Sequence, residues 1–369
     1  PHGALLAAIA ALGLAACPSR PSTPPTVRRP GPPQPDRPPA ERPLPTVPKV
    51  LAFTRPAPPP ATGKAVPLIA HLRTELQRNL SGLRSASCPA PHFLAYAVND
   101  TIQHRIRAGS GALEGSAKLH ARQLTVDLRV GTRAFDNTHF MERRTGANGG
   151  TLPLDDAADA IRTAVWLATD ASYLAACKEY ARVKAKAQTT SKEDDPSADF
   201  AAAPVTNLVY DRLPATLDVK DWEGRLRRVS AGFRSHPEVR NGAVELNVWS
   251  TLRIFVTSEG TVTQVPEVRY TITMTAQAMA DDGMDFQRFE SAFASTAEGL
   301  PSEAALTALA RTMVADLLAL RQAPLAEPFE GPAIFRGRAA AVFFHEVFGH
   351  RMEGHRQKQR RSDQTFTRK

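Results

Sequence analysis

The residues best suited to chemistry lie near the carboxyl end of the sequence. His345 and His350 stand five residues apart, and Glu346 directly follows the first histidine. Neutral imidazole nitrogens bind Zn²⁺, and a glutamate beside them can take a proton from a metal-bound water. The pattern therefore indicates metal-dependent hydrolysis. On spacing alone an alternative is equally open, in which these are polar residues at the exposed end of a buried helix.

The spacing of five residues sets a condition on the local backbone. In an ideal α-helix the second histidine is rotated about 140° from the first, whereas the familiar zinc motif places its histidines four residues apart on one face. Both rings can face one ion only if the helix widens locally, as in a π-helical turn, or ends near Gly349. Gly349 stands where such an irregularity costs least, because glycine has the fewest backbone restrictions.

The helices that must position this segment are predicted by the spacing of apolar residues. We expect helices over residues 66–83, 155–187 and 219–233, and a further helix that begins after an N-cap at Ser302. The apolar stripe of this further helix consists of Leu306, Leu309, Met313, Leu317 and Leu320.

Alternation of apolar and polar residues predicts strands among these helices. The expected strands cover residues 124–130, 244–248, 252–256 and 270–274, with a turn at 258–261 and a loop at 188–204. Helices and strands in this mixture predict an α+β fold class, an antiparallel sheet with long helices. Cys88 and Cys177 lie in this body, and they are either a disulfide, which an exported chain allows, or two separate buried thiols.

The amino end is typical of a targeting segment. Residues 5–16 form an apolar run that is too short to span a bilayer, and it ends in a lipobox-like Leu-Ala-Ala before Cys17. Cys17 is the expected lipidation site, with a buried helix and a chance cysteine as the alternative. Pro18 follows where an Asp would indicate retention in the inner membrane, so we expect an outer-membrane anchor that faces the periplasm.

A proline-rich linker follows the expected anchor. Residues 1–60 contain 18 of the 31 prolines and carry a net charge of +5. Another +5 lies in residues 351–369, so the middle, residues 61–350, has a net charge of −1. A balanced body argues against a nucleic-acid-binding face, so we expect no nucleic-acid partner.

The histidine segment resembles the HExxxH stretch of the TldD/PmbA family of zinc metallopeptidases. The family's acidic-Gly pair after the motif is matched by Glu353 and Gly354. Residues 331–335 resemble the family's strand that leads into the motif helix. The turns at 258–261 and 280–283 resemble turns of the family's amino-terminal domain. Residues 129–131 and 136–137 look like a lipoprotein-type branch of the family.

This resemblance implies a function and a set of roles. His345 and His350 match the two histidine ligands of Zn²⁺, and Glu346 matches the catalytic base. The family implies unfolded or small peptides as substrates and a homodimer or heterodimer with a family partner. The implied organisation is a signal peptide over 1–17, a linker over 18–63, an α+β domain over 64–325, and the start of a truncated β-rich catalytic domain over 326–369.

The sequence also departs from the family. The usual third ligand, a Cys from the later domain, has no counterpart here, because no cysteine follows Cys177. Glu353 and His355 are candidate extra ligands, although both are better explained as surface residues. Two other functions stay open: a non-catalytic family partner or envelope scaffold, and a lipoprotein that binds envelope polymers through its basic linker and tail.

Overall fold

A computed structural model describes residues 61–140, 147–189 and 197–353 of the chain. The expected lipidation site at Cys17 and the candidate ligand His355 lie outside these ranges. All described residues belong to one compact unit, Pro59–Lys369. None of its described helices is both long and apolar enough to cross a membrane.

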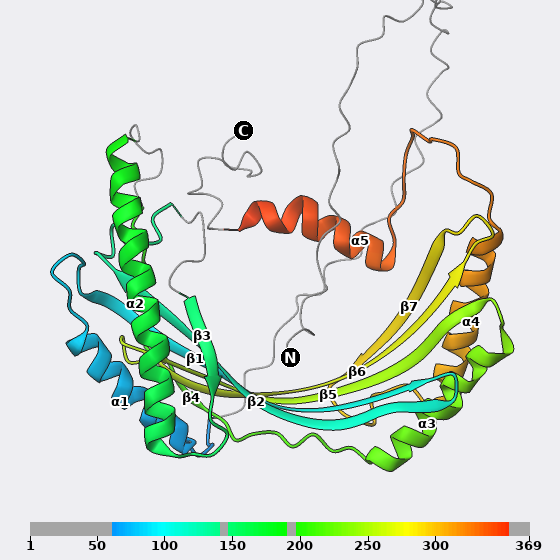
Figure 1. Ribbon diagram of the computed structural model, residues 1–369, viewed down its shortest axis with the longest axis horizontal. Helices are drawn as coiled ribbons and strands as arrows, with labels where there is room; N and C mark the ends of the chain where they lie inside the picture. The colour runs from blue at the N-terminus through cyan, green and yellow to red at the C-terminus, as the bar shows by residue number, and fades with distance from the viewer. Residues whose placement is uncertain (1–60, 141–146, 190–196, 354–369) are drawn as a thin grey trace, which may run out of the picture. The chain divides into compact units, whose positions relative to one another are not determined.

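The centre of this unit is a seven-stranded sheet with very long strands (Figure 1). The strand order is β3-β2-β1-β5-β6, and both β4 and β7 pair with β6. All pairs are antiparallel except β4 with β6, which is parallel. The strands are β1 (Pro91–Gly109), β2 (Ala112–Val130), β3 (Ala147–Leu152), β4 (Asn207–Val209), β5 (Val239–Thr257), β6 (Val262–Met279) and β7 (Asp285–Ala294).

Two pairs of helices flank the sheet, one pair beside each end of the long strands (Figure 1). The first pair is α1 (Pro67–Gly82) and α2 (Ala158–Thr189); the second is α3 (Val219–Ala231) and α4 (Glu303–Gln322). A further helix, α5 (Gly337–Phe344), follows α4 in the chain. The α+β class predicted from the sequence is confirmed.

The two helix pairs cover the same face of the sheet. Even-numbered side chains of β1, β5 and β6 point toward the helices, because side chains alternate along a strand. One core joins Tyr96, Val98 and Ile254 to α1 and α2. The other core joins Ile106, Leu246 and their neighbours on β6 to α3 and α4. The odd-numbered side chains form the opposite face, which we call the open face.

The structure corrects the predicted strand boundaries. Residues 244–248 and 252–256 belong to one continuous strand, β5, and not to two. Ser250 lies between the two apolar runs, and its buried hydroxyl donates to the Leu213 carbonyl at 2.8 Å, so the alternation continues through it. Strand β1 was not predicted, because polar residues such as Asp100 interrupt its apolar alternation.

Two helix predictions also need correction. Helix α2 begins at Ala158, three residues later than expected, and Asp155 and Asp156 just before it accept hydrogen bonds from Arg122. In α4, Ser302 is the N-cap, as predicted, and accepts a hydrogen bond from the Ala305 amide. Leu320, however, is exposed and does not belong to the buried stripe of that helix.

A buried ion cluster lies between the two cores on the helix-bearing face. The Asp100 carboxylate accepts hydrogen bonds from His120 at 2.7 Å and Arg122 at 2.8 Å, and pairs with Arg212 at 2.8 Å. Burial raises the pKa of Asp100, but the hydrogen bonds from His120 and Arg122 and the charge of Arg212 outweigh it and lower the pKa overall.

A disulfide joins Cys88 to Cys177 on α2, 89 residues further along the chain. Of the two alternatives for these cysteines, the disulfide is present. It ties the segment before β1 to the middle of α2, beside the core that those elements share.

Removing this disulfide is expected to destabilise the fold. Cys88→Ala with Cys177→Ala should lower the free energy of unfolding by about 2–5 kcal/mol, because the crosslink restricts a long loop in the unfolded chain. Urea unfolding of wild type and double variant, each with and without dithiothreitol, measures the difference. Reductant should affect only the wild type, and equal stability of reduced and oxidised wild type would contradict the expectation.

Replacing Asp100 tests the ion cluster. Asp100→Asn should cost about 3 kcal/mol near pH 7, because the arginines keep their charges and lose a buried partner. A lowered pKa in the folded state means that the stabilisation is complete above the unfolded pKa of about 3.9 and is lost as the pH falls through the folded value. Urea unfolding at pH 7 and at pH 3 should therefore show the difference between variant and wild type shrinking at low pH.

The matched control for this experiment is Asp127→Asn. Asp127 is 45% exposed and pairs with Arg129 at 3.2 Å near the surface, so its loss should cost less than about 1 kcal/mol. If both variants lose the same stability, the cluster around Asp100 has no special role.

Candidate metal centre

The motif segment contacts strand β7 at its beginning, through Arg338. The guanidinium of Arg338, in the first turn of α5, lies 4.7 Å from the ring centroid of Phe289 and 3.3 Å from the Glu290 carboxylate. None of the residues of α5 is buried, although six of its eight residues are Ala, Val or Phe. A helix that is apolar on all sides usually packs against further protein.

The segment that leads into α5 differs from the prediction. Residues 331–335 resemble a family strand, but the structure has no strand between α4 and α5. Ile334 is almost fully exposed, and Phe335 stacks on Phe343 of α5 with ring centroids 4.7 Å apart. This contact within the segment takes the place of pairing with the sheet.

The helix widens where the two histidines stand. A π-helical turn, η2 (His345–Gly349), continues α5, and a short 3₁₀ turn, η3 (His350–Met352), follows it. The His350 amide donates to the His345 carbonyl, which is the i to i+5 hydrogen bond of a π-helix. The condition that the five-residue spacing imposed is therefore met by a π-helical turn.

Gly349 does not produce this turn through special backbone freedom. Its φ and ψ are −56° and −53°, which any residue adopts, and an added Cβ would meet its nearest atom, the Phe344 carbonyl oxygen, at 3.8 Å. The irregularity does end at Gly349, but the backbone there is right-handed and does not use the extra freedom of a glycine.

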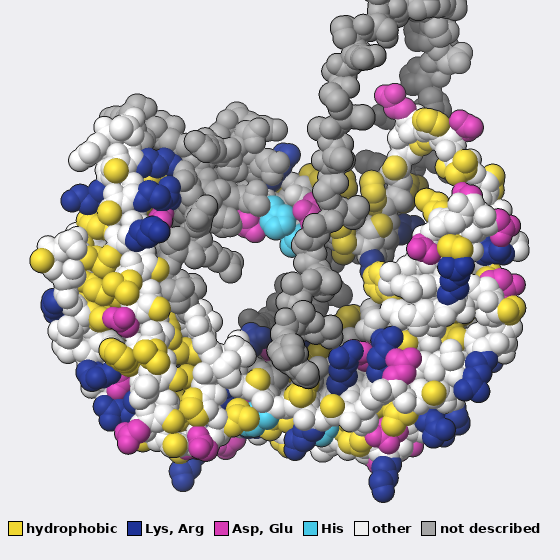
Figure 2. All heavy atoms as spheres, viewed as in Figure 1, with side chains coloured by type: hydrophobic (Ala, Val, Ile, Leu, Met, Phe, Trp, Pro, Cys, Tyr) yellow, Lys and Arg dark blue, Asp and Glu magenta, His cyan; other side chains and the backbone are white. Residues whose placement is uncertain are grey.

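The π-helical turn brings three side chains together. His345, Glu346 and His350 each offer a ligand atom, and these atoms lie within 4.8 Å of one another. The Glu346 carboxylate is 3.6 Å from Nε2 of His350 and 3.9 Å from Nε2 of His345, and the two imidazole centroids are 4.5 Å apart. In Figure 2, histidine and acidic side chains lie side by side on the exposed surface.

Glu353 contacts the site from the outside. Nδ1–H of His350 donates to Oε1 of Glu353 at 2.8 Å, which leaves Nε2 of the same ring for a metal ion. A carboxylate in this position orients a histidine ligand and increases its basicity. The structure thus gives Glu353 a contact with His350, and a role as a ligand stays a prediction.

The donor set fits zinc. Two imidazoles and a carboxylate are ligands that Zn²⁺ accepts, and two ligand atoms at about 2.1 Å from one tetrahedral ion lie about 3.4 Å apart. The two separations from Glu346 to the histidine nitrogens are close to this value. All three side chains are accessible, with Glu346 61% exposed, so a water molecule can enter.

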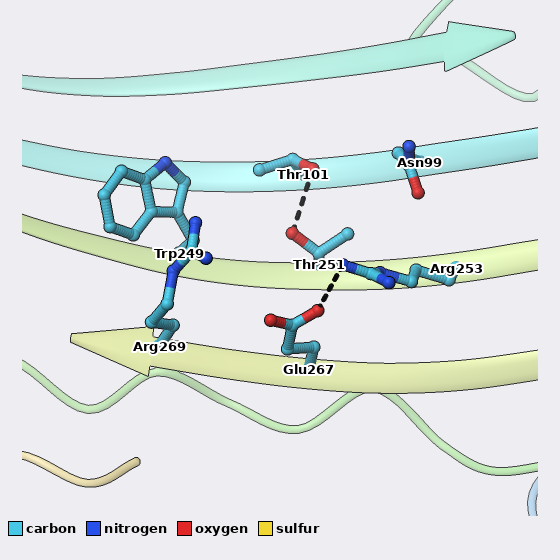
Figure 3. A pocket seen from close by; sticks show the side chains of 7 residues that line it. All are labelled: Asn99, Thr101, Trp249, Thr251, Arg253, Glu267 and Arg269. Atoms are coloured by element: carbon cyan, nitrogen blue, oxygen red, sulfur yellow. Dashed lines mark hydrogen bonds and ion pairs between the residues drawn. The ribbon is translucent and has the colours of Figure 1, made fainter. Parts of the chain in front are cut away.

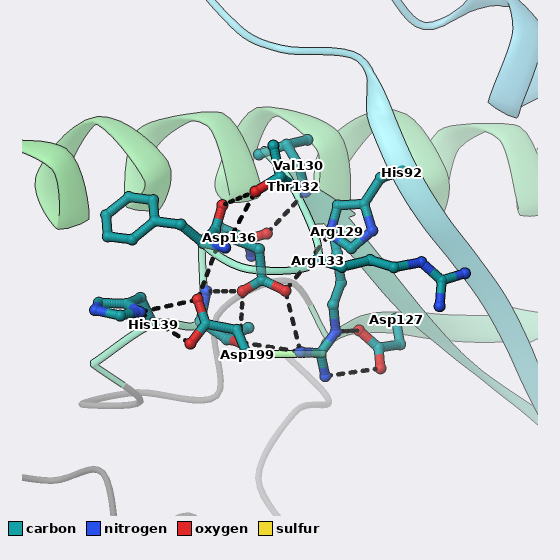
Figure 4. Close-up of polar contacts among 12 residues, drawn as sticks. His92, Asp127, Arg129, Val130, Thr132, Arg133, Asp136, His139 and Asp199 are labelled. Carbon is teal, nitrogen blue, oxygen red and sulfur yellow. Dashed lines mark hydrogen bonds and ion pairs between the residues drawn. The ribbon is translucent and has the colours of Figure 1, made fainter. Parts of the chain in front are cut away.

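A second group of polar residues, matched in sequence at 129–131 and 136–137, forms a separate cluster (Figure 4). Asp136 is fully buried and bonds Thr138 and Arg129 at 2.6 and 3.5 Å. Burial raises the pKa of Asp136, but hydrogen bonds from His92 and Thr138 and the charge of Arg129 lower it overall. The Asp199 carboxylate accepts from the Asp136 amide at 2.9 Å.

This cluster holds a loop in place. The Asn137 side chain accepts from the Val130 amide at 2.9 Å, and His139 bonds Asp199 at 2.9 Å, so residues 131–140 are fixed at the end of β2. Sequence reasoning missed Asp199 and His139, because they lie about 60 residues apart in the chain with no motif to connect them. Among the described residues, the group of side chains close enough together to bind a metal ion is the histidine group at η2. The cluster around Asp136 is not such a group.

Comparison with known proteins finds solved structures that are similar to part of this chain. No family model and no curated protein matches the chain. It is similar to a proposed modulator of DNA gyrase from Thermotoga maritima, with 10% identity, a TM-score of 0.37, and coverage of 60% of this chain and 44% of that one. A second proposed modulator of DNA gyrase, from Bacteroides thetaiotaomicron, has 8% identity, a TM-score of 0.38, and coverage of 68% and 49%. TldE from Thermococcus kodakarensis has 8% identity, a TM-score of 0.36, and coverage of 69% of this chain and 47% of that one. The match therefore spans less than half the length of each of these three proteins.

The contact between Glu353 and His350 generates a prediction. Glu353→Gln should weaken Zn²⁺ binding about 10- to 100-fold, because the amide is a poorer acceptor for Nδ1–H and orients the ring less firmly. Zinc titration followed by calorimetry measures the change. Glu327→Gln, an exposed glutamate in the segment before α5, is the control and should bind zinc as the wild type does. Equal affinity of Glu353→Gln and wild type would remove Glu353 from the site.

Proposed function

We propose that this chain is part of a zinc-dependent metallopeptidase of TldD/PmbA type, which hydrolyses peptide bonds in unfolded or small peptides. The observation that carries the proposal is the π-helical turn, which brings His345, Glu346 and His350 together despite a spacing that an α-helix would place on different faces. The HExxxH pattern and the acidic residue after it match this family in sequence.

Each residue has a role in this proposal. His345 and His350 hold the ion through imidazole nitrogens, and Nε2 is the free nitrogen of His350 because Nδ1 faces Glu353. When bound there, Zn²⁺ would supply Lewis-acid chemistry for the peptide carbonyl and the attacking water. Glu346 takes the proton from the attacking water and passes it to the leaving amine, so the peptide C–N bond breaks as the new C–O bond forms. Its position between both histidines suits this proton transfer.

A third protein ligand belongs to the proposal. Among the described residues, the group of possible ligands at this turn consists of the two histidines and Glu346. If Glu346 is the base, the two histidines are the ligands that remain, and a catalytic zinc site, which has three protein ligands, needs one more. We expect it from another part of the protein or from a paired subunit, which would also cover the exposed apolar surface of α5.

The cellular setting is likewise part of the proposal. A lipid anchor at Cys17 and a proline-rich linker would tether the folded unit at the outer membrane, facing the periplasm. The disulfide between Cys88 and Cys177 supports this setting, because such bonds persist in oxidising compartments. Pairing with a second copy or a family partner would complete the site.

Two substitutions test the chemistry. Glu346→Gln should abolish cleavage of an unfolded peptide, such as reduced casein, by the full-length protein while zinc remains bound, because it removes the base and not a ligand. His345→Ala should abolish cleavage and also lower the zinc content. Cleavage is measured by release of amino groups, and zinc by elemental analysis of the purified protein.

The control is His236→Ala, which changes a histidine outside the site and should alter neither quantity. Peptide cleavage that persists in both Glu346→Gln and His345→Ala would refute the proposal. Wild-type protein that binds zinc and cleaves no unfolded peptide would favour the non-catalytic scaffold.

A further inference from the structure

The open face of the sheet contains a hollow that is lined by none of the residues used in the proposed chemistry. Odd-numbered side chains of β1, β5 and β6 line a space of about 270 Å³ near the middle of these strands (Figure 3). The residues that matter for its chemistry are Asn99, Trp249, Thr251, Arg253, Glu267 and Arg269.

Part of this hollow is already paired. Arg253 forms an ion pair with Glu267 at 2.6 Å, and the hydroxyls of Thr101 and Thr251 bond each other at 3.0 Å. These contacts cross between neighbouring strands, as Figure 3 shows. They fix the Glu267 carboxylate as an acceptor in the floor of the hollow, while 40% of its side chain stays exposed.

Three hydrogen-bond donors beside this pair have no partner in the part of the chain that the structure describes. The Arg269 guanidinium lies 4.6 Å from the centroid of the Trp249 ring and makes no ion pair there. The indole N–H of Trp249 and the amide of Asn99 make no hydrogen bond within the same residues. Stacking on the indole orients the guanidinium, so less conformational entropy is lost when it binds a ligand.

The mixture of groups restricts the ligand. A guanidinium is suited to a carboxylate, which it binds with two parallel hydrogen bonds. The nearby Glu267 carboxylate is neutralised by its ion pair with Arg253 and accepts hydrogen bonds from hydroxyl groups. A hollow with free donors, a fixed acceptor and one aromatic ring therefore matches a ligand with both hydroxyl and carboxylate groups.

The position on the sheet separates sugars from peptides. Backbone groups of β1, β5 and β6 are engaged in the ladders that connect these strands. An extended peptide gains much of its affinity from main-chain hydrogen bonds at a sheet edge, and the middle of a sheet face offers none. A sugar needs only side-chain partners, because its own groups are hydroxyls.

We propose that this hollow binds a short acidic oligosaccharide, with a carboxylate on Arg269 and hydroxyls on Trp249, Asn99 and Glu267. The site is independent of the histidine motif and would let the protein hold an acidic glycan on its open face. An acidic peptide is the competing ligand, and the experiment distinguishes the two.

Calorimetric titration of the full 369-residue chain tests the proposal with three probes of equal length. A tetramer of galacturonic acid should bind saturably. A neutral tetramer of glucose should bind at least about tenfold more weakly, because it has no carboxylate for Arg269. A tetraglutamate peptide should also bind at least about tenfold more weakly, because it has carboxylates but no hydroxyl groups for Glu267. Arg269→Gln should weaken binding of the galacturonate about tenfold. Trp249→Phe keeps an aromatic ring and removes the indole N–H, so it should weaken binding several-fold.

The matched control is Arg240→Gln, which removes an exposed arginine of β5 outside the hollow and should leave affinity within about twofold. Asn99→Ala changes an exposed residue that lines the hollow. It therefore tests the site even if Trp249→Phe perturbs the fold. Absence of saturable binding, equal affinity for tetraglutamate, or equal effects of Arg269→Gln and Arg240→Gln would each overturn the proposal.

Discussion

A buried carboxylate, Asp100, occupies the position on which the architecture depends. Strands of 19 residues, such as β1, are about 60 Å long, which exceeds what one helical layer covers. The fold therefore places two separate cores on one face and must fill the space between them. Asp100 does so with arginines from β2 and from the segment before α3, which hydrogen-bond across the gap. Because these charges satisfy one another, the strands can continue through the gap without exposing a broken core.

The parts of this fold that sequence predicts are those with a single buried side. Leu124 to Val130 and Leu306 to Leu317 follow their periods closely, and the corresponding elements are present. Prediction fails where polar groups replace apolar ones at buried positions: Ser250 looks like a break in β5, and Asp100 conceals β1. The partners that satisfy these groups come from distant segments, so local sequence holds no sign of them. Residues 331–335 show a different error: their resemblance to a family strand predicts a strand, but Ile334 is almost fully exposed and Phe335 packs on Phe343 of α5.

The histidine site was accessible to sequence reasoning because it is local. The rotation per residue in an α-helix excludes a shared ion at a spacing of five, so the sequence predicts either a local widening of the helix or a helix end near Gly349. The structure has the first of these, a π-helical turn at His345–Gly349. The part played by Glu353 is also local, three residues after His350. By contrast, Asn99, Trp249 and Arg269 meet only through the register of three strands. Their residue types are ordinary for an exposed sheet face, so nothing in the sequence marks them as a group.

The pairing of β1 with β5 also governs how the chain can fold. Thr101 and Thr251 face each other across this pair although 150 residues separate them in the chain. Both cores rest on these same two strands, so neither core can be completed until that distant pairing has formed. High sequence separation of this kind slows folding, because a long loop must close before any contact compensates for its entropy. The two cores should consequently form and dissolve together as one cooperative unit, and the chain should spend longer than a helical protein of equal size in states that expose unpaired strand edges.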